Sequence, residues 1–274
     1  MAAKRKTPVV VTSNCIIEAC YQLTLAEKRV ILTVINQLDS HSAAPPPETR
    51  YLICAAEFAE LFKIPIKQAY ELLRDGVDRL GERWLWVETE PGISPLMEED
   101  KLRWVERIRY SKTQGCIELS LTQSILPYLT ALSREFTQYR LQHVVGLPTV
   151  YSIRLYELLV QWRSVGEREL EVAWLRERFQ LAGKYPMLKD FKRWVVDPSV
   201  AQINEHTDIW VKYTQKKRGR VIWSFIFTFG PKSEKKPDPE KPAPNKRLTQ
   251  KEMASVARPG ESWEELKRRL GVGQ

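Results

Sequence analysis

Cations crowd a short, glycine-containing stretch of the sequence. Residues 215–220 read Gln-Lys-Lys-Arg-Gly-Arg, and four of them are cationic: Lys216, Lys217, Arg218 and Arg220. Such charges at the tip of a hairpin repel one another, and a polyanion relieves that repulsion. For a nucleic acid, the release of counterions from the phosphates supplies affinity that falls steeply with salt. The alternative is a solvated basic turn.

A second group of cations lies upstream, in a segment that we expect to be helical. Three of them, at spacing i, i+3 and i+4, share one helix face: Lys189, Lys192 and Arg193. The other face is apolar: Leu188, Phe191 and Val195. Arginine can grip a guanine edge through two hydrogen bonds, and lysine serves bases or phosphates. We therefore expect DNA contacts here and at two residues before the helix, Lys184 and Tyr185; an exposed charged face is the alternative.

A thinner set of polar residues occurs earlier in the chain. We predict further DNA contacts at five positions: Lys63, Lys67, Gln68, Arg74 and Lys112. Acidic residues dilute the positive charge of the same segment: Glu71, Asp75 and Asp78. We therefore expect weaker DNA contact here, or a protein–protein role, with an ordinary solvated helix as the alternative.

Signatures of catalysis are missing from the sequence. It contains no Gly-x-x-x-x-Gly-Lys-Ser/Thr loop, so that route to nucleotide hydrolysis is excluded. No paired-histidine metal motif accompanies a tyrosine, as a DNA-nicking relaxase would need, and Tyr151 and Tyr156 are interpreted as packing residues. We predict a protein that is not an enzyme, with no catalytic residue, metal or cofactor.

The cysteines form no Cys-x-x-Cys pair and lie far from the three histidines: Cys15, Cys20, Cys54, Cys116, His41, His143 and His206. This spacing disfavours zinc and indicates reduced, buried thiols. The net charge is +9, an excess that attracts polyanions such as nucleic acid. No long apolar run or signal peptide is recognised, so we expect a cytoplasmic protein without a membrane partner.

Hydrophobic periodicity predicts one order of elements twice. The first copy comprises helices at 14–23 and 24–38 (with Thr24 and Glu27 as a capping box), a strand at 51–54, helices at 56–62 and 66–82, and strands at 84–88, 102–110 and 117–121. The second comprises a helix at 152–162, a strand at 169–172, helices at 173–181 and 187–204, and strands at 209–213 and 221–229 around a loop at 214–220. A helix-turn-helix followed by a hairpin is the plan of a winged helix, whose last helix enters the DNA major groove. Pro198 should kink the 187–204 helix or start a new segment.

The predicted fold class is α+β, with tandem winged-helix domains and a disordered C-terminal tail. The predicted divisions are a basic flexible arm at 1–13, a first winged helix at 14–135, a second at 136–230, and a proline- and charge-rich linker with a short amphipathic helix at 231–274. The main DNA contacts are expected in the second domain. The tail helix, marked by Trp263, Leu266 and Leu270, could dock on a partner or fray.

Several motifs carry a resemblance to a known family. They are Ser13-Asn14, Glu18-Ala19, Leu23-Thr24-Leu25, Glu27-Lys28-Arg29, Ile31-Leu32, Tyr151-Ser152, Arg154-Leu155-Tyr156-Glu157-Leu158, Leu188-Lys189-Asp190-Phe191, Val196-Asp197-Pro198, Ile203-Asn204-Glu205, Thr207-Asp208 and Gly219-Arg220. Over residues 13–230 the sequence resembles the iteron-binding plasmid replication initiators, including those of the F-plasmid type. The tail at 231–274 lies outside this likeness.

The resemblance implies a function and partners. Monomers would bind direct repeats (iterons) at an origin and start plasmid replication. Homodimers, formed through the first domain, would repress the protein's own promoter at an inverted repeat. A host initiator ATPase and the replicative helicase would be partners. Two alternatives remain open: a winged-helix transcription repressor without a replication role, and a DNA-nicking relaxase.

Overall fold

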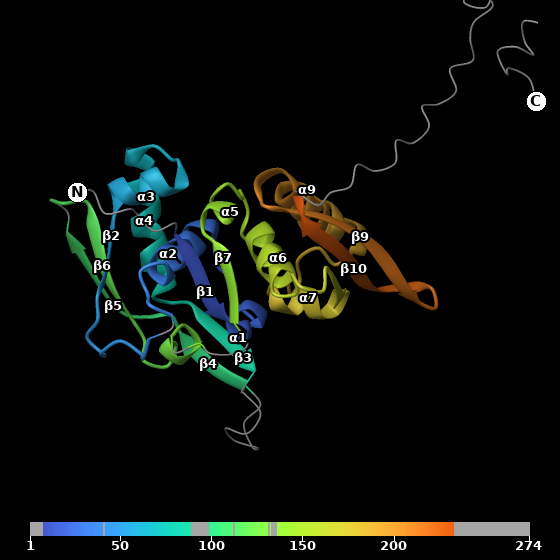
Figure 1. Cartoon of the computed structure of the whole chain (residues 1–274), viewed down its shortest axis with the longest axis horizontal. Coiled ribbons are helices and arrows are strands. Elements are labelled where there is room, and N and C mark those ends of the chain that lie inside the picture. Colours follow the sequence, from blue (N-terminus) through green and yellow to red (C-terminus); the bar gives the residue numbers. More distant parts are fainter. Residues whose placement is uncertain are drawn as a thin grey trace, which may run out of the picture. The chain divides into compact units, whose positions relative to one another are not determined.

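Helices and strands alternate along the chain in an order that occurs twice (Figure 1). The structure is a computed structural model that describes residues 8–40, 42–88, 99–111, 113–130, 132 and 136–232. The predicted DNA contact Lys112 and the predicted tail helix lie outside these residues. No helix of the described residues is long and apolar enough to cross a membrane.

The first module runs from residue 9 to 145. Its elements are β1 (Val9–Ser13), α1 (Asn14–Glu18), α2 (Leu25–Ile35), β2 (Tyr51–Cys54), α3 (Ala55–Phe62), α4 (Ile66–Leu80), β3 (Trp84–Glu88), β4 (Glu99–Arg103), β5 (Val105–Ser111), β6 (Cys116–Leu121), the 3₁₀ turn η1 (Leu126–Tyr128), β7 (Phe136–Arg140) and α5 (Gln142–Val145). Strands β2, β6 and β5 form an antiparallel sheet against which α3 and α4 make a helix-turn-helix. This is a winged helix, as predicted, and the β5–β6 hairpin is its wing.

The second module runs from residue 150 to 231 and repeats that plan. Its elements are α6 (Val150–Val160), β8 (Glu167–Glu171), α7 (Val172–Arg178), α8 (Leu188–Phe191), the π-helical turn η2 (Lys192–Val196), α9 (Asp197–His206), β9 (Ile209–Arg218) and β10 (Val221–Pro231). Its sheet has the order β8-β10-β9. The prediction of a loop at 214–220 is wrong for residues 214–218, because β9 continues to Arg218. Only Gly219 and Arg220 form the turn.

The N-terminal boundary differs from the prediction. The flexible arm expected at 1–13 is wrong for Val9–Ser13, which pairs with β7 and is largely buried. Its run of β-branched residues suits a strand, but its partner lies more than a hundred residues away. Ser13 then caps α1, which ends at Glu18 rather than at Leu23. By its pairing, β7 belongs to the first module, although the predicted boundary placed residue 136 in the second.

The predicted strand at 102–110 is two strands. Trp104, almost fully buried, stands at the corner between β4 and β5. On one side of the corner β4 pairs with β3, and on the other β5 pairs with β6. The β3–β4 hairpin is therefore an addition between the helix-turn-helix and its wing.

Two of the four cysteines contradict the expectation of reduced thiols. Cys54 and Cys116 are directly opposite each other on β2 and β6, with their Cα atoms 4.0 Å apart, and form a disulfide. They are 62 residues apart in sequence, so only the strand register brings them together. Cys15 and Cys20 are not part of a disulfide and are half-buried.

Helices α8 and α9 are joined through η2 into one helical segment, Leu188–His206. Pro198, the second residue of α9, lacks an N–H and would crowd the carbonyl one turn earlier in a regular helix. The π-helical turn ends at Val196, directly before α9, and widens the helix there. The predicted disturbance at Pro198 therefore takes the form of this widened turn.

Candidate nucleic-acid interface

The wing of the second module is the most cationic hairpin of the described residues. Strands β9 and β10 extend beyond the end of β8, and the orange hairpin in Figure 1 projects from the module. Gly219 has φ of +60°, a conformation that glycine adopts without strain, and this permits the tight turn. Lys217, Arg218 and Arg220 are exposed, and among the described residues none of them forms a close ion pair, although the charge of Arg218 also acts on Glu169. The wing can therefore present three cations to a polyanion.

Lys216 is different from its neighbours. Its Nζ lies 2.8 Å from Glu169 Oε2 on β8, and the Ser224 hydroxyl donates to the other oxygen of the same carboxylate. These hydrogen bonds, from Lys216 and then Ser224, lower the pKa of Glu169 and keep it anionic. The positive charge of Lys216 is thus partly neutralised within the protein.

The helical segment after Pro186 presents its cations to solvent, as expected. Lys189 and Arg193 are exposed, whereas Phe191 and Val195 are buried in the core. Lys192 is half-buried, with its Nζ 5.8 Å from the centre of the Tyr213 ring. Exposed cations opposite an apolar face are the arrangement that a recognition helix needs.

The two residues before this helix differ from each other. Lys184 is exposed. Tyr185 is half-buried against the core and has φ of +51°, so its ring helps to hold the turn. Only the exposed part of the Tyr185 side chain could therefore make the predicted contact with DNA.

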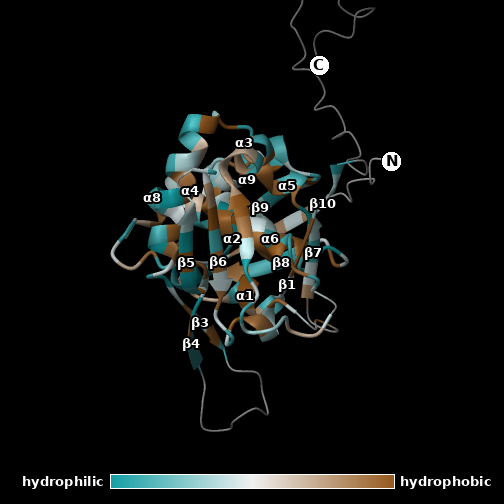
Figure 2. Cartoon of the chain, turned by 90° about the vertical axis from the view of Figure 1, so that its left-hand side faces the viewer, coloured by the Kyte–Doolittle hydropathy of each residue, from teal (hydrophilic) through white to brown (hydrophobic). Residues whose placement is uncertain are grey.

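The first module presents a more mixed surface. The predicted contacts of its helix-turn-helix are all exposed: Lys63, Lys67, Gln68 and Arg74. Asp75 pairs with Arg79 at 3.9 Å, and Asp78 accepts a hydrogen bond from Tyr110 of the wing. Figure 2 shows α4 and α8 along the same margin of the described fold.

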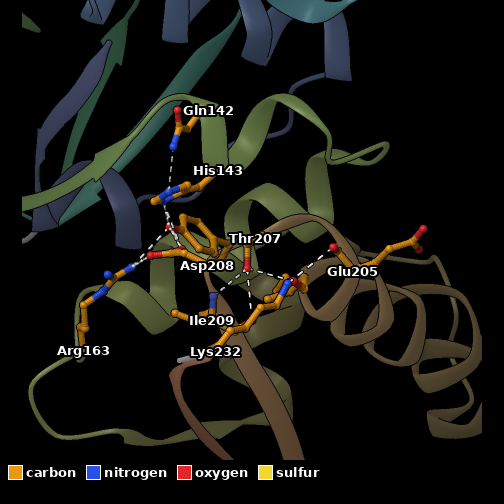
Figure 3. Close-up of polar contacts among 10 residues, drawn as sticks. Gln142, His143, Arg163, Glu205, Thr207, Asp208, Ile209 and Lys232 are labelled. Carbon is orange, nitrogen blue, oxygen red and sulfur yellow. Dashed lines mark hydrogen bonds and ion pairs between the residues drawn. The ribbon is translucent and has the colours of Figure 1, made fainter. Parts of the chain in front are cut away.

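A polar cluster around Asp208 fixes the connection between α9 and β9 (Figure 3). Asp208 accepts hydrogen bonds from Tyr156 at 2.8 Å and Arg163 at 2.7 Å, and His143 lies 3.2 Å away. Burial opposes the charge of Asp208, but the two donors hold its pKa below the usual value. The Thr207 hydroxyl donates to Ile203 O and closes the end of α9. The cluster therefore holds the end of the helical segment and the first strand of the wing in a fixed position relative to each other.

Comparison with known proteins connects this arrangement to one family. A family model for the initiator replication protein, WH1, matches residues 9–160, and one for the initiator Rep protein, WH2, matches residues 171–229. The chain belongs to the initiator replication protein family. An Escherichia coli replication initiation protein is 26% identical over 226 residues, which cover 80% of this chain and 68% of that protein. An Escherichia coli PI protein is 29% identical over 238 residues, which cover 76% of this chain and 78% of that protein.

A solved structure of an initiator has the same fold. The crystal structure of the Pi initiator protein in complex with iteron DNA matches with a TM-score of 0.70 and 26% identity, covering 82% of this chain and 98% of that one. The tandem winged-helix fold and the resemblance to replication initiators are confirmed. The F-plasmid type stays a prediction, because the matches do not single it out.

Some exposed residues of the initiator fold were not selected from the sequence. Ile66 and Met187, at the starts of α4 and α8, are more than half exposed, and so is Trp194 beside Arg193. On the first wing, Arg107 and Arg109 are exposed, and Arg109 pairs with Glu118 at 3.3 Å. A signal for Ile66 and Met187 was available in the sequence, since each directly follows a proline at the start of a helix.

Proposed function

We propose that this chain binds double-stranded DNA at the iterons of a plasmid origin and initiates replication there as a monomer. As a homodimer formed through the first module it represses its own promoter at an inverted repeat. Neither role involves catalysis or a cofactor. Both roles place the protein in the cytoplasm.

One observation carries this proposal. The second module exposes a cationic helix face, with Lys189 and Arg193, and a cationic wing, with Lys217, Arg218 and Arg220. A helix in the major groove and a hairpin along the neighbouring phosphates use these two surfaces together. The Pi initiator, which has the same fold over 98% of its chain, is bound to iteron DNA.

The two modules take unequal shares of the duplex. Arg193 and Lys189 read base edges from the second module, while the wing cations contact phosphates and set the register. Lys63, Lys67, Gln68 and Arg74 supply a second, weaker contact, because Asp75 and Asp78 lie on the same helix. The recognition helices of the two modules engage successive major grooves.

Initiation follows from occupancy of several adjacent sites. Bound protomers bend the origin and favour opening of a neighbouring AT-rich stretch, at a deformation cost of several kcal/mol that protein contacts offset. A host initiator ATPase and the replicative helicase then join the opened DNA. The balance between dimer and monomer decides whether promoter or origin is occupied.

A footprint on the parent replicon tests the proposal. The full chain should protect several direct repeats at regular spacing, and adding protein should give a ladder of retarded complexes. The control is the same fragment with scrambled repeats. Protection of a lone palindrome, without direct repeats, would instead establish a transcription repressor.

Strand cleavage is the competing activity. A nicking enzyme needs an accessible tyrosine, but Tyr156 is fully buried and donates its hydroxyl hydrogen bond to Asp208. Tyr151 stacks on Phe179, with ring centres 5.7 Å apart. Supercoiled origin plasmid incubated with the protein and magnesium or manganese should stay supercoiled, and specific nicking would overturn the non-enzymatic proposal.

A further inference from the structure

Both recognition helices start with a large apolar side chain that lies in solvent. Ile66, the first residue of α4, is 56% exposed, and Met187, the N-cap residue of α8, is 57% exposed. Moving such side chains out of water is favourable, and none of the described residues covers either of them. Something outside the described chain can therefore cover them.

The two positions share a short sequence pattern. The turns read Lys63-Ile64-Pro65-Ile66 and Lys184-Tyr185-Pro186-Met187, so both have a lysine, a proline and then the exposed residue. Each turn also contains a residue with left-handed backbone, Lys63 three residues before Ile66 and Tyr185 two residues before Met187, with φ of +53° and +51°. In both modules a proline thus directly precedes an apolar side chain at the start of the helix, although the turns differ in length.

The surroundings of these side chains indicate a polyanion rather than an apolar protein surface. Lys63, Lys67 and Gln68 are exposed beside Ile66, and Lys184 and Lys189 are exposed beside Met187. A protein patch that covered the apolar atoms would bring uncompensated lysines into its interface. A DNA groove offers phosphates to the lysines.

We propose that Ile66 and Met187 each contact the 5-methyl group of a thymine in the major groove. The first residues of a recognition helix are those that reach the base edges. Among the four bases, thymine presents an apolar methyl group in the major groove. This inference rests on the proposed function and deepens it, since each DNA repeat would contain a thymine under each helix start.

Replacing thymine by deoxyuridine removes only that methyl group, and this gives a direct test. One protected repeat is prepared as a thymine duplex and as a deoxyuridine duplex, and full-length wild type, Ile66→Ala and Met187→Ala are titrated against both. Wild type should lose about fourfold in affinity for each contacted methyl, the change expected for one apolar carbon left in water. For each alanine variant, the loss of affinity on exchange of thymine for deoxyuridine should be about fourfold smaller than for wild type, because one methyl contact is already absent.

A matched control is Val165→Ala. Val165 is also apolar and 61% exposed, but it lies in the connection between α6 and β8 and belongs to neither recognition helix. This variant should distinguish the two duplexes as wild type does. Equal thermal midpoints of all variants would exclude unfolding as a cause of weaker binding.

The remaining outcomes separate this inference from the proposed function. Specific binding by wild type with equal affinity for both duplexes would overturn the methyl contacts and leave the initiator proposal intact. Alanine variants that weaken both duplexes equally would also overturn it and assign the two residues to another contact. Failure of wild type to prefer the repeat over scrambled DNA would overturn the proposed function itself.

Discussion

Several cations of the second module rest on aromatic rings. The Arg193 guanidinium lies 5.1 Å from the centre of the Trp194 ring, and Arg218 lies 3.9 Å from that of Trp223. An aromatic face attracts a guanidinium and restricts its rotamers, so less entropy is lost when the arginine binds. The aromatic neighbours therefore act as positioning residues for the cations.

This arrangement predicts the effects of two substitutions in the recognition helix. Arg193→Ala should relax the preference at one guanine of the site by about 1–3 kcal/mol, because alanine cannot donate the two hydrogen bonds to its edge. Trp194→Ala should weaken the preference for guanine at the same position by a smaller amount, since Arg193 remains but no longer packs on the Trp194 ring. Affinities for a panel of single-base variants of the site measure both effects. A loss that is uniform across the panel would show that Arg193 contacts phosphate instead.

At the scale of elements, the wing should set the salt dependence of binding. Lys217→Ala, Arg218→Ala and Arg220→Ala should each weaken binding to all sequences. The slope of log affinity against log salt should shrink by about 0.9 for each phosphate that a variant no longer neutralises. Lys216→Ala is the matched control on the same hairpin, and it should change the slope less because Glu169 already pairs with this lysine. An unchanged slope in the first three variants would remove the wing from the interface.

The sequence predicted the elements whose signals are local. The capping box forms as expected, with Thr24 N donating to Glu27 Oε2 at 2.7 Å, and the apolar stripes give the helices of both modules. The cation-rich wing was visible for the same reason, since its charges are adjacent in sequence. Boundaries were less accurate: α2, for example, ends at Ile35 rather than at Leu38.

Features that depend on distant partners could not be predicted. The pairing of β1 with β7, the Cys54–Cys116 disulfide and the Lys216–Glu169 ion pair each join segments far apart in the chain. The strand break at Trp104 depends on the core that buries its indole. Local propensity carries no information about such contacts, because tertiary packing decides them.

At the scale of the whole fold, the two winged helices share a charged, buried joint. Lys28 of α2 pairs with Glu157 of α6 at 2.9 Å, and both are almost fully buried. Tyr139 of β7 donates to the same carboxylate at 2.5 Å. Nearby, Arg154 donates to backbone carbonyls of Ala19, Tyr21 and Arg178. Breaking such a network leaves a buried charge without compensation, so it couples the modules strongly.

This joint should make the protein sensitive to alkali. Burial, and then the charge of Glu157, raise the pKa of Tyr139. For Lys28, burial favours the neutral amine, but Glu157 and Tyr21 outweigh it and raise the pKa. The folded protein thus keeps protons that the unfolded chain releases above about pH 10. These groups stabilise the fold fully below that pH, and their contribution is lost as the pH rises.

Tyr139→Phe isolates one of these titrations. At pH 7 the variant should be less stable by about 2 kcal/mol, because one buried hydrogen bond to the charged Glu157 carboxylate is removed. Its stability should then fall less steeply than that of wild type above about pH 10, since phenylalanine has no proton to release. Urea unfolding between pH 7 and 11.5 measures both slopes, and Tyr70→Phe, at a half-exposed tyrosine on α4, is the control. Parallel alkaline slopes for Tyr139→Phe and wild type would show that Tyr139 does not titrate with unfolding and that the joint is not the alkali-sensitive part of the fold.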